Sequence, residues 1–103
     1  MDNIQKNNYV NYTPLYLELE ITNTLPQNKT IVLSFDPNTI LLDTTNVNYL
    51  KRTAVSSTTI GSYTYVNGFQ FTLNSMTSTR VRFYKVNPSQ NYTGTSVVTV
   101  STL

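Results

Sequence analysis

A strict alternation of apolar and polar side chains near the start of the chain constrains its fold more than any other feature. The segment reads Leu15, Tyr16, Leu17, Glu18, Leu19, Glu20, Ile21, Thr22. A period of two places every second side chain on one face of an extended strand. Residues 15–22 are therefore predicted to form a strand with one buried face.

The same alternation recurs in short segments that turn-forming residues separate. We predict further strands at residues 30–35, 60–66, 69–73, 79–86 and 95–101, a short apolar run at 39–42, a less regular strand at 47–55, and a polar loop at 56–59. Asp36-Pro37-Asn38 predicts a turn between two of these segments. Asn67-Gly68 predicts a two-residue type I′ hairpin turn, because both residues tolerate positive φ.

Seven or eight short strands with turns between them predict an all-β fold. Nowhere in the sequence do apolar residues recur three and four positions apart over the length of a helix. We expect a single antiparallel β-sandwich, with a small closed barrel as the alternative.

The first fourteen residues lack this pattern. They contain four Asn and two Tyr without sustained alternation, and Pro14 favours an extended approach to the first strand. We interpret residues 1–14 as an N-terminal arm and residues 15–103 as one domain, since about 100 residues suit a single core. The arm is predicted to become ordered on a neighbouring subunit, where it would bury Ile4, Tyr9, Val10 and Tyr12.

The amino-acid composition excludes most common catalytic mechanisms. The 103 residues include no Cys and no His, which excludes disulfides, the usual zinc sites and Ser-His or Cys-His nucleophile pairs. Asp36 and Asp43 lack the dense ligand spacing of a calcium loop, and turn formation explains such residues better. We expect no enzyme activity, no catalytic residue, no metal site and no cofactor.

The charges also argue against nucleic acids and membranes as partners. The net charge is +2, but the cations are scattered as Lys51-Arg52 and as Arg80, Arg82 and Lys85. Binding to nucleic acid needs Lys and Arg gathered on one face. No segment approaches the ~20 apolar residues of a membrane-spanning helix, and the first residues do not resemble a secretory signal.

Two pairs of charged residues have matching spacing. Glu18 and Glu20 lie two apart on the outward face of one predicted strand, and Arg80 and Arg82 do so on another. We favour the interpretation that the two strands pair within one sheet, so that the Glu and Arg side chains form an ion ladder. Alternatively, each charged pair contacts a neighbouring subunit. A catalytic carboxylate pair is disfavoured because such pairs usually come from different elements that face one cleft.

The eight Tyr residues give a further candidate surface. Tyr63 and Tyr65 share one face of a predicted strand, and exposed aromatic rings with polar tips suit both protein and carbohydrate contacts. Sugar-binding platforms most often include Trp, and this chain has none. We therefore rank protein contact above carbohydrate binding.

Residues 15–86 resemble bacterial and phage immunoglobulin-like modules in the segments LYLELEITNTLP, TIVLSFDPNTILLD and FQFTLNSMTSTRVRFYKV. The Cys-Trp-Cys hallmark of antibody-type domains is missing. The resemblance implies a β-sandwich that serves as a spacer in a cell-surface protein or as an auxiliary domain on a phage capsid or tail. A chain that starts at its own Met without a signal peptide and stops after its last predicted strand favours the second setting.

These observations lead to one hypothesis and one alternative. The hypothesis is a non-enzymatic structural protein of a virion, made in the host cytoplasm: a bacteriophage decoration protein that attaches to capsid or tail subunits, or to copies of itself. The alternative is a carbohydrate-binding or host-adhesion module that uses Tyr63 and Tyr65. We expect no small-molecule substrate in either case.

Overall fold

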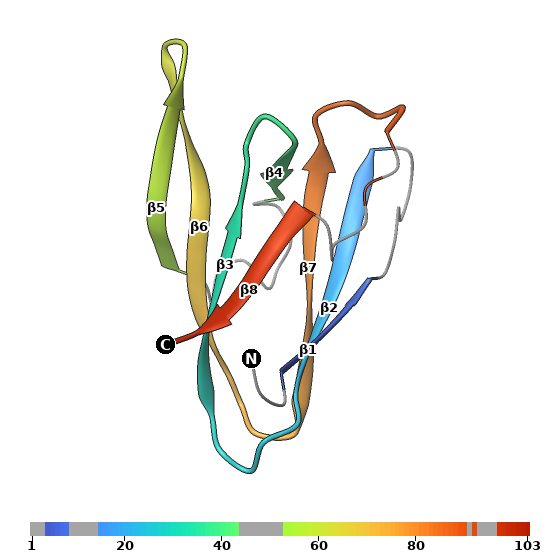
Figure 1. Cartoon of the computed structure of the whole chain (residues 1–103), viewed down its shortest axis with the longest axis vertical. Coiled ribbons are helices and arrows are strands. Elements are labelled where there is room, and N and C mark those ends of the chain that lie inside the picture. Colours follow the sequence, from blue (N-terminus) through green and yellow to red (C-terminus); the bar gives the residue numbers. More distant parts are fainter. Residues whose placement is uncertain (1–3, 9–14, 44–52, 91, 93–96) are drawn as a thin grey trace.

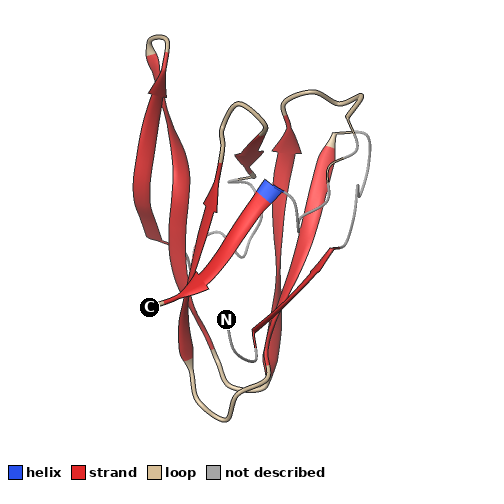
Figure 2. Ribbon diagram, viewed as in Figure 1, coloured by secondary structure: helices blue, strands red, loops and turns tan. Residues whose placement is uncertain are grey.

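The computed structural model describes residues 4–8, 15–43, 53–90, 92 and 97–103, and most of these residues lie in strands (Figure 2). The strands are β1 (Ile4–Asn8), β2 (Tyr16–Asn23), β3 (Lys29–Phe35), β4 (Ile40–Leu42), β5 (Thr53–Ile60), β6 (Tyr63–Leu73), β7 (Thr77–Lys85) and β8 (Val98–Thr102). The prediction of an all-β protein is confirmed. Among the described residues, no helix is long and apolar enough to cross a bilayer.

The strands form two four-stranded antiparallel sheets that pack against each other (Figure 1). Sheet A has the order β1-β2-β7-β4 and sheet B the order β5-β6-β3-β8. Each sheet keeps two edge strands, which a closed barrel would not have. The fold is therefore the predicted antiparallel β-sandwich and not the barrel.

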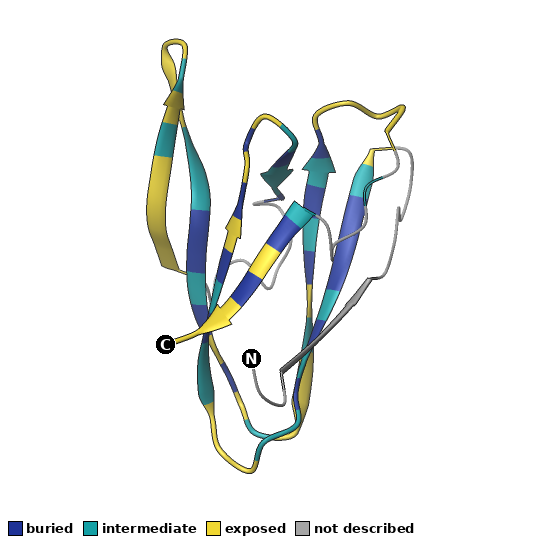
Figure 3. Ribbon diagram, in the orientation of Figure 1, coloured by how far each residue is buried: buried dark blue, intermediate teal, exposed yellow. Residues whose placement is uncertain are grey.

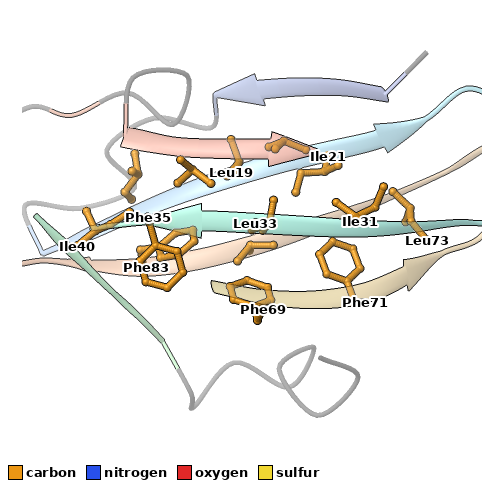
Figure 4. Packing of buried hydrophobic residues seen from close by; sticks show 14 residues of the cluster. Leu19, Ile21, Ile31, Leu33, Phe35, Ile40, Phe69, Phe71, Leu73 and Phe83 are labelled. Atoms are coloured by element: carbon orange, nitrogen blue, oxygen red, sulfur yellow. The ribbon is translucent and has the colours of Figure 1, made fainter. Parts of the chain in front are cut away.

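The alternating residues of the sequence build the core between the sheets (Figure 4). The buried apolar side chains are Leu17, Leu19, Ile21, Ile31, Leu33, Phe35, Ile40, Phe69, Phe71, Leu73, Val81, Phe83, Val98 and Val100. The ring of Phe35 in sheet B lies edge-on to that of Phe83 in sheet A, with 4.9 Å between the ring centroids. Large inward-facing side chains of both sheets thus fill one layer, as sandwich packing requires.

A buried amide joins two turns at one end of the sandwich. Asn23 closes β2 and is fully buried. Its Nδ2 donates to the carbonyl oxygens of Gln27 (2.9 Å), Leu73 (3.1 Å) and Asn74 (3.3 Å), and its Oδ1 accepts from the N–H of Leu25 (2.9 Å). One side chain therefore ties the β2–β3 turn to the end of β6.

The start of the predicted arm belongs to the sandwich. Residues 4–8 form β1, which pairs antiparallel with β2 from Ile4 opposite Asn23 to Asn8 opposite Leu19. The expectation that the arm is separate from the sheets is therefore wrong for these residues, since backbone hydrogen bonding needs no apolar alternation. Tyr9, Val10 and Tyr12 lie outside the described residues.

The turn between β5 and β6 is not where the sequence pattern placed it. Ile60 pairs with Tyr63, so Gly61 and Ser62 form the two-residue turn, with φ of +65° at Gly61. Glycine at the first central position is typical of a type II′ turn, which suits a hairpin as well as type I′ does. The prediction of a turn at Asn67-Gly68 is therefore wrong, and both residues lie within β6.

Asn67 and Gly68 mark an irregularity in the hairpin instead. Ser56 pairs with Gly68 and Ser57 with Val66, so Asn67 is an extra residue in β6. A Cβ at Gly68 would overlap Oγ of Ser56 on the neighbouring strand. Asn-Gly here serves a β-bulge and a close contact between strands.

The polar segment 56–59 is a strand and not the predicted loop. It belongs to β5, which begins at Thr53, whereas most of the predicted strand at 47–55 lies outside the described residues. The first five residues of β5 are exposed (Figure 3). A strand with little burial needs no apolar alternation, which is why the pattern missed it.

The predicted turn at Asp36-Pro37-Asn38 is confirmed. The N–H of Asn38 donates to Oδ1 of Asp36, and the N–H of Thr39 donates to the carbonyl oxygen of Asp36.

Candidate functional site

The outward face of sheet A carries the predicted ion ladder. Glu18 pairs with Arg82 and Glu20 with Arg80 in the register of β2 and β7. Nη2 of Arg82 lies 3.2 Å from Oε2 of Glu18, and Nε of Arg80 lies 3.9 Å from Oε2 of Glu20. The prediction of a ladder within one sheet is confirmed.

The two pairs of the ladder differ in their surroundings. Glu18 is only 5% exposed, and Arg82 donates to it from both Nε (3.3 Å) and Nη2 (3.2 Å). The guanidinium of Arg82 also lies 5.3 Å from the ring centroid of Tyr16, whose ring packs on that of Tyr84. Glu18 therefore has little accessible surface with which to contact another protein. In the second pair, the side chain of Arg80 remains half-exposed.

Tyr63 and Tyr65 lie side by side on the β5–β6 hairpin. Their ring centroids are 6.4 Å apart, and Tyr63 is 68% exposed. Their cross-strand partners are Ile60 and Thr58, which share their face of the hairpin. The structure thus brings the two predicted tyrosines together at a protruding end of sheet B (Figure 1).

The outer face of sheet B is hollowed beside this hairpin. Within the described part of the chain, a groove of about 610 Å³ is lined by Ser34 of β3, Thr99 of β8, and Thr58 and Ile60 of β5. Ser34 lies opposite Thr99, and its neighbours Leu33 and Phe35 are buried, so Ser34 faces outward. The lining therefore offers mainly neutral hydrogen-bonding groups.

Asn67 adds one unusual group to this groove. Its side chain lines the groove, and its buried Oδ1 accepts no hydrogen bond from the described residues. Buried polar atoms are nearly always paired, so such an acceptor stands out. A ligand hydroxyl or amide could donate to it.

Metal ligands do not gather in the part of the chain that the structure describes. No three His, Cys, Asp or Glu side chains lie close enough there to hold an ion. Asp36, which lines the groove, instead accepts hydrogen bonds from the backbone N–H and the Nδ2 of Asn38.

No protein-family model, no curated protein and no solved structure matches this chain. Its candidate surfaces are therefore defined by its own geometry.

The free edge of β5 is a surface that the sequence did not reveal. β5 is the last strand of sheet B, and no described strand lies beyond it. Its residues, TAVSSTTI, include no charge and no Pro. Thr, Val and Ile favour strands, so these residues could have indicated β5 in the sequence. The prediction missed the strand because it relied on apolar alternation, which β5 lacks.

Proposed function

We propose that this chain is a non-enzymatic structural protein of a virus particle, a bacteriophage decoration protein that attaches to capsid or tail through protein–protein contacts. The resemblance of residues 15–86 to phage immunoglobulin-like modules motivates the setting. The observation that carries the mode of attachment is the pairing of β1 with the edge of β2.

Strand addition of this kind depends on backbone hydrogen bonds more than on particular side chains. Residues 4–8 can therefore leave their own β2 and add to an unpaired strand edge of a capsid or tail subunit. One strand pair is lost and one is formed, so the transfer costs little in interaction energy. Many copies on a symmetric lattice would convert weak single contacts into firm attachment.

The test is co-sedimentation of the purified chain with the particles produced by cells that carry its gene. Full-length protein should co-sediment in saturable amounts. Deletion of residues 2–13 should reduce the bound amount, and it should also lower the thermal stability because it removes an edge strand of sheet A.

A disulfide provides the matched control for the arm. Gln5 lies opposite Thr22, and the chain has no Cys, so Gln5→Cys with Thr22→Cys creates a single pair that locks β1 on its own β2. The oxidised variant should lose attachment and the reduced variant should regain it. Attachment by both the oxidised variant and the deletion would remove the arm from the mechanism, and no attachment by the full chain would refute the function.

The second candidate is a carbohydrate-binding or host-adhesion module. Specific support comes from the adjacent Tyr63 and Tyr65 and from the groove beside them, whose polar lining residues are uncharged apart from Asp36. Aromatic rings stack on sugar rings, and Oδ1 of Asn67 offers an acceptor for a sugar hydroxyl.

A glycan array tests this candidate. Binding should be lost on Tyr63→Ala, Tyr65→Ala or Asn67→Ala and kept on Tyr16→Ala, which removes a ring from β2 of sheet A. If the unmodified chain binds no glycan on a broad array, the carbohydrate-binding function is refuted.

A further inference from the structure

We propose that the free edge of β5 pairs with the β5 edge of a second copy of this chain, which joins two B sheets into one continuous sheet across a twofold axis. This inference is independent of the proposed function, because it rests on the edge strand alone.

The first step concerns which backbone groups face the free edge. Ile60 and Tyr63 flank the two-residue turn, and such a closing pair is hydrogen-bonded in a hairpin. Hydrogen-bonded and non-bonded pairs alternate along an antiparallel ladder. Thr59 and Ser57 therefore direct their N–H and C=O away from β6, and the contact between Oγ1 of Thr59 and Oγ1 of Thr64 (3.2 Å) fits the closer side chains of a non-bonded pair.

The second step fixes the register. Two copies satisfy these outward groups when Ser57 of each copy pairs with Thr59 of the other, which places Thr58 on the twofold axis. Ser56 then lies opposite Ile60, and exposed Val55 lies opposite Gly61, where no side chain obstructs it. The paired stretch lies largely beyond the register shift that surrounds Val55, so the bulge limits the contact to a short, closed dimer.

The third step identifies the occupant. Natural proteins protect sheet edges with charge, Pro or short length, and β5 has eight residues with neither charge nor Pro. Because β5 carries no charge, it has no electrostatic preference for a partner with a different sequence. Two identical β5 strands also do not repel each other. Thr opposite Thr and Ser opposite Thr are favourable cross-strand pairs, so the segment is self-complementary.

The small contact predicts a reversible equilibrium, because stable interfaces bury considerably more surface than five paired residues provide. Sedimentation velocity from about 10 μM to about 1 mM, a range that spans such affinities, should show a shift from monomer to dimer. Thr58→Lys places two ammonium groups across the axis and should raise the dissociation constant about fivefold or more at low salt. Thr58→Glu should act in the same way.

Mixing the two variants gives the decisive measurement. An equimolar mixture of Thr58→Lys and Thr58→Glu should form a heterodimer at low salt, because opposite charges then meet at the axis, and added salt should weaken it. Thr72→Lys is the matched control, since it adds the same charge to an exposed position of central strand β6 and should leave the dimer unchanged. Circular dichroism should show that all variants keep the β-sandwich.

Three outcomes would overturn the inference. The unmodified chain could remain monomeric at every concentration, the Thr58→Lys variant could dimerise as well as the unmodified chain, or the mixture could fail to associate. Pairing of β5 only with a strand of another protein would equally exclude the second copy as its occupant.

Discussion

The buried amide of Asn23 should be one of the most sensitive polar positions of the sandwich. An amide NH₂ has two hydrogens, so Nδ2 can make two good bonds at a time to its three surrounding carbonyl oxygens. The bond that Oδ1 accepts from Leu25 is the third. Asn23→Ala removes all three and leaves buried backbone groups unpaired.

The magnitude follows from this count. A hydrogen bond contributes a net 0.5–1.5 kcal/mol, so Asn23→Ala should lower the free energy of unfolding by about 3 kcal/mol. In a domain of this size such a loss lowers the Tm by about 10–20 °C. Asn23→Asp keeps the shape and the acceptor but places an oxygen against the carbonyl groups, so it should cost at least as much.

The assay is urea unfolding followed by circular dichroism, with a thermal scan in parallel. Asn28→Ala is the matched control, because Asn28 also joins the two turns but is exposed and accepts one bond, from the N–H of Ser75 (2.9 Å). Water replaces that partner, so the control should lose about 0.5 kcal/mol. Equal losses for Asn23→Ala and Asn28→Ala would refute the role of the buried amide.

Three further sets of substitutions test a close contact between strands, a turn and the ion ladder. Gly68→Ala should cost about 1 kcal/mol because its Cβ would overlap Oγ of Ser56, and Ser56→Ala in the same chain should recover most of that loss in urea unfolding; a neutral Gly68→Ala would contradict the close contact. Met76→Gly should raise the stability by about 0.5 kcal/mol, since Met76 has a φ of +57° in the exposed β6–β7 turn, and a lower Tm would show that Met76 makes an unrecognised contact. Arg82→Ala should cost about 2 kcal/mol or more because it leaves the buried carboxylate of Glu18 without its partner, whereas Arg80→Ala should cost less than about 0.5 kcal/mol; similar losses for both, measured by chemical denaturation, would remove the distinction between the two pairs.

The candidate surfaces were predictable to different degrees. The spacing of Glu18, Glu20, Arg80 and Arg82 was sufficient to favour a ladder, because strands with one buried face must place these residues on the other. The adjacency of Tyr63 and Tyr65 followed from the same period. The groove was not predictable, since Ser34, Asn67 and Thr99 come from three strands that only the folded sheet brings together.

The sequence by itself determined the parts of the fold in which burial selects the residue type. In β2, β3, β7 and the second half of β6, one face is covered by the opposite sheet, so apolar side chains must recur at every second position. The turn at Asp36-Pro37-Asn38 was equally local, because the Asp36 side chain bonds to the backbone two residues on.

Only the tertiary structure decided the edge strands β1 and β5. β1 and β5 pair along one side through backbone groups that every residue carries, and so their sequences need no alternation. The same holds for Asn67-Gly68, which local propensity assigns to a turn, while the pairing of Ser56 with Gly68 makes it part of a strand. Burial leaves a periodic pattern in a sequence, as it does in edge strand β8, whereas backbone pairing by itself leaves almost none.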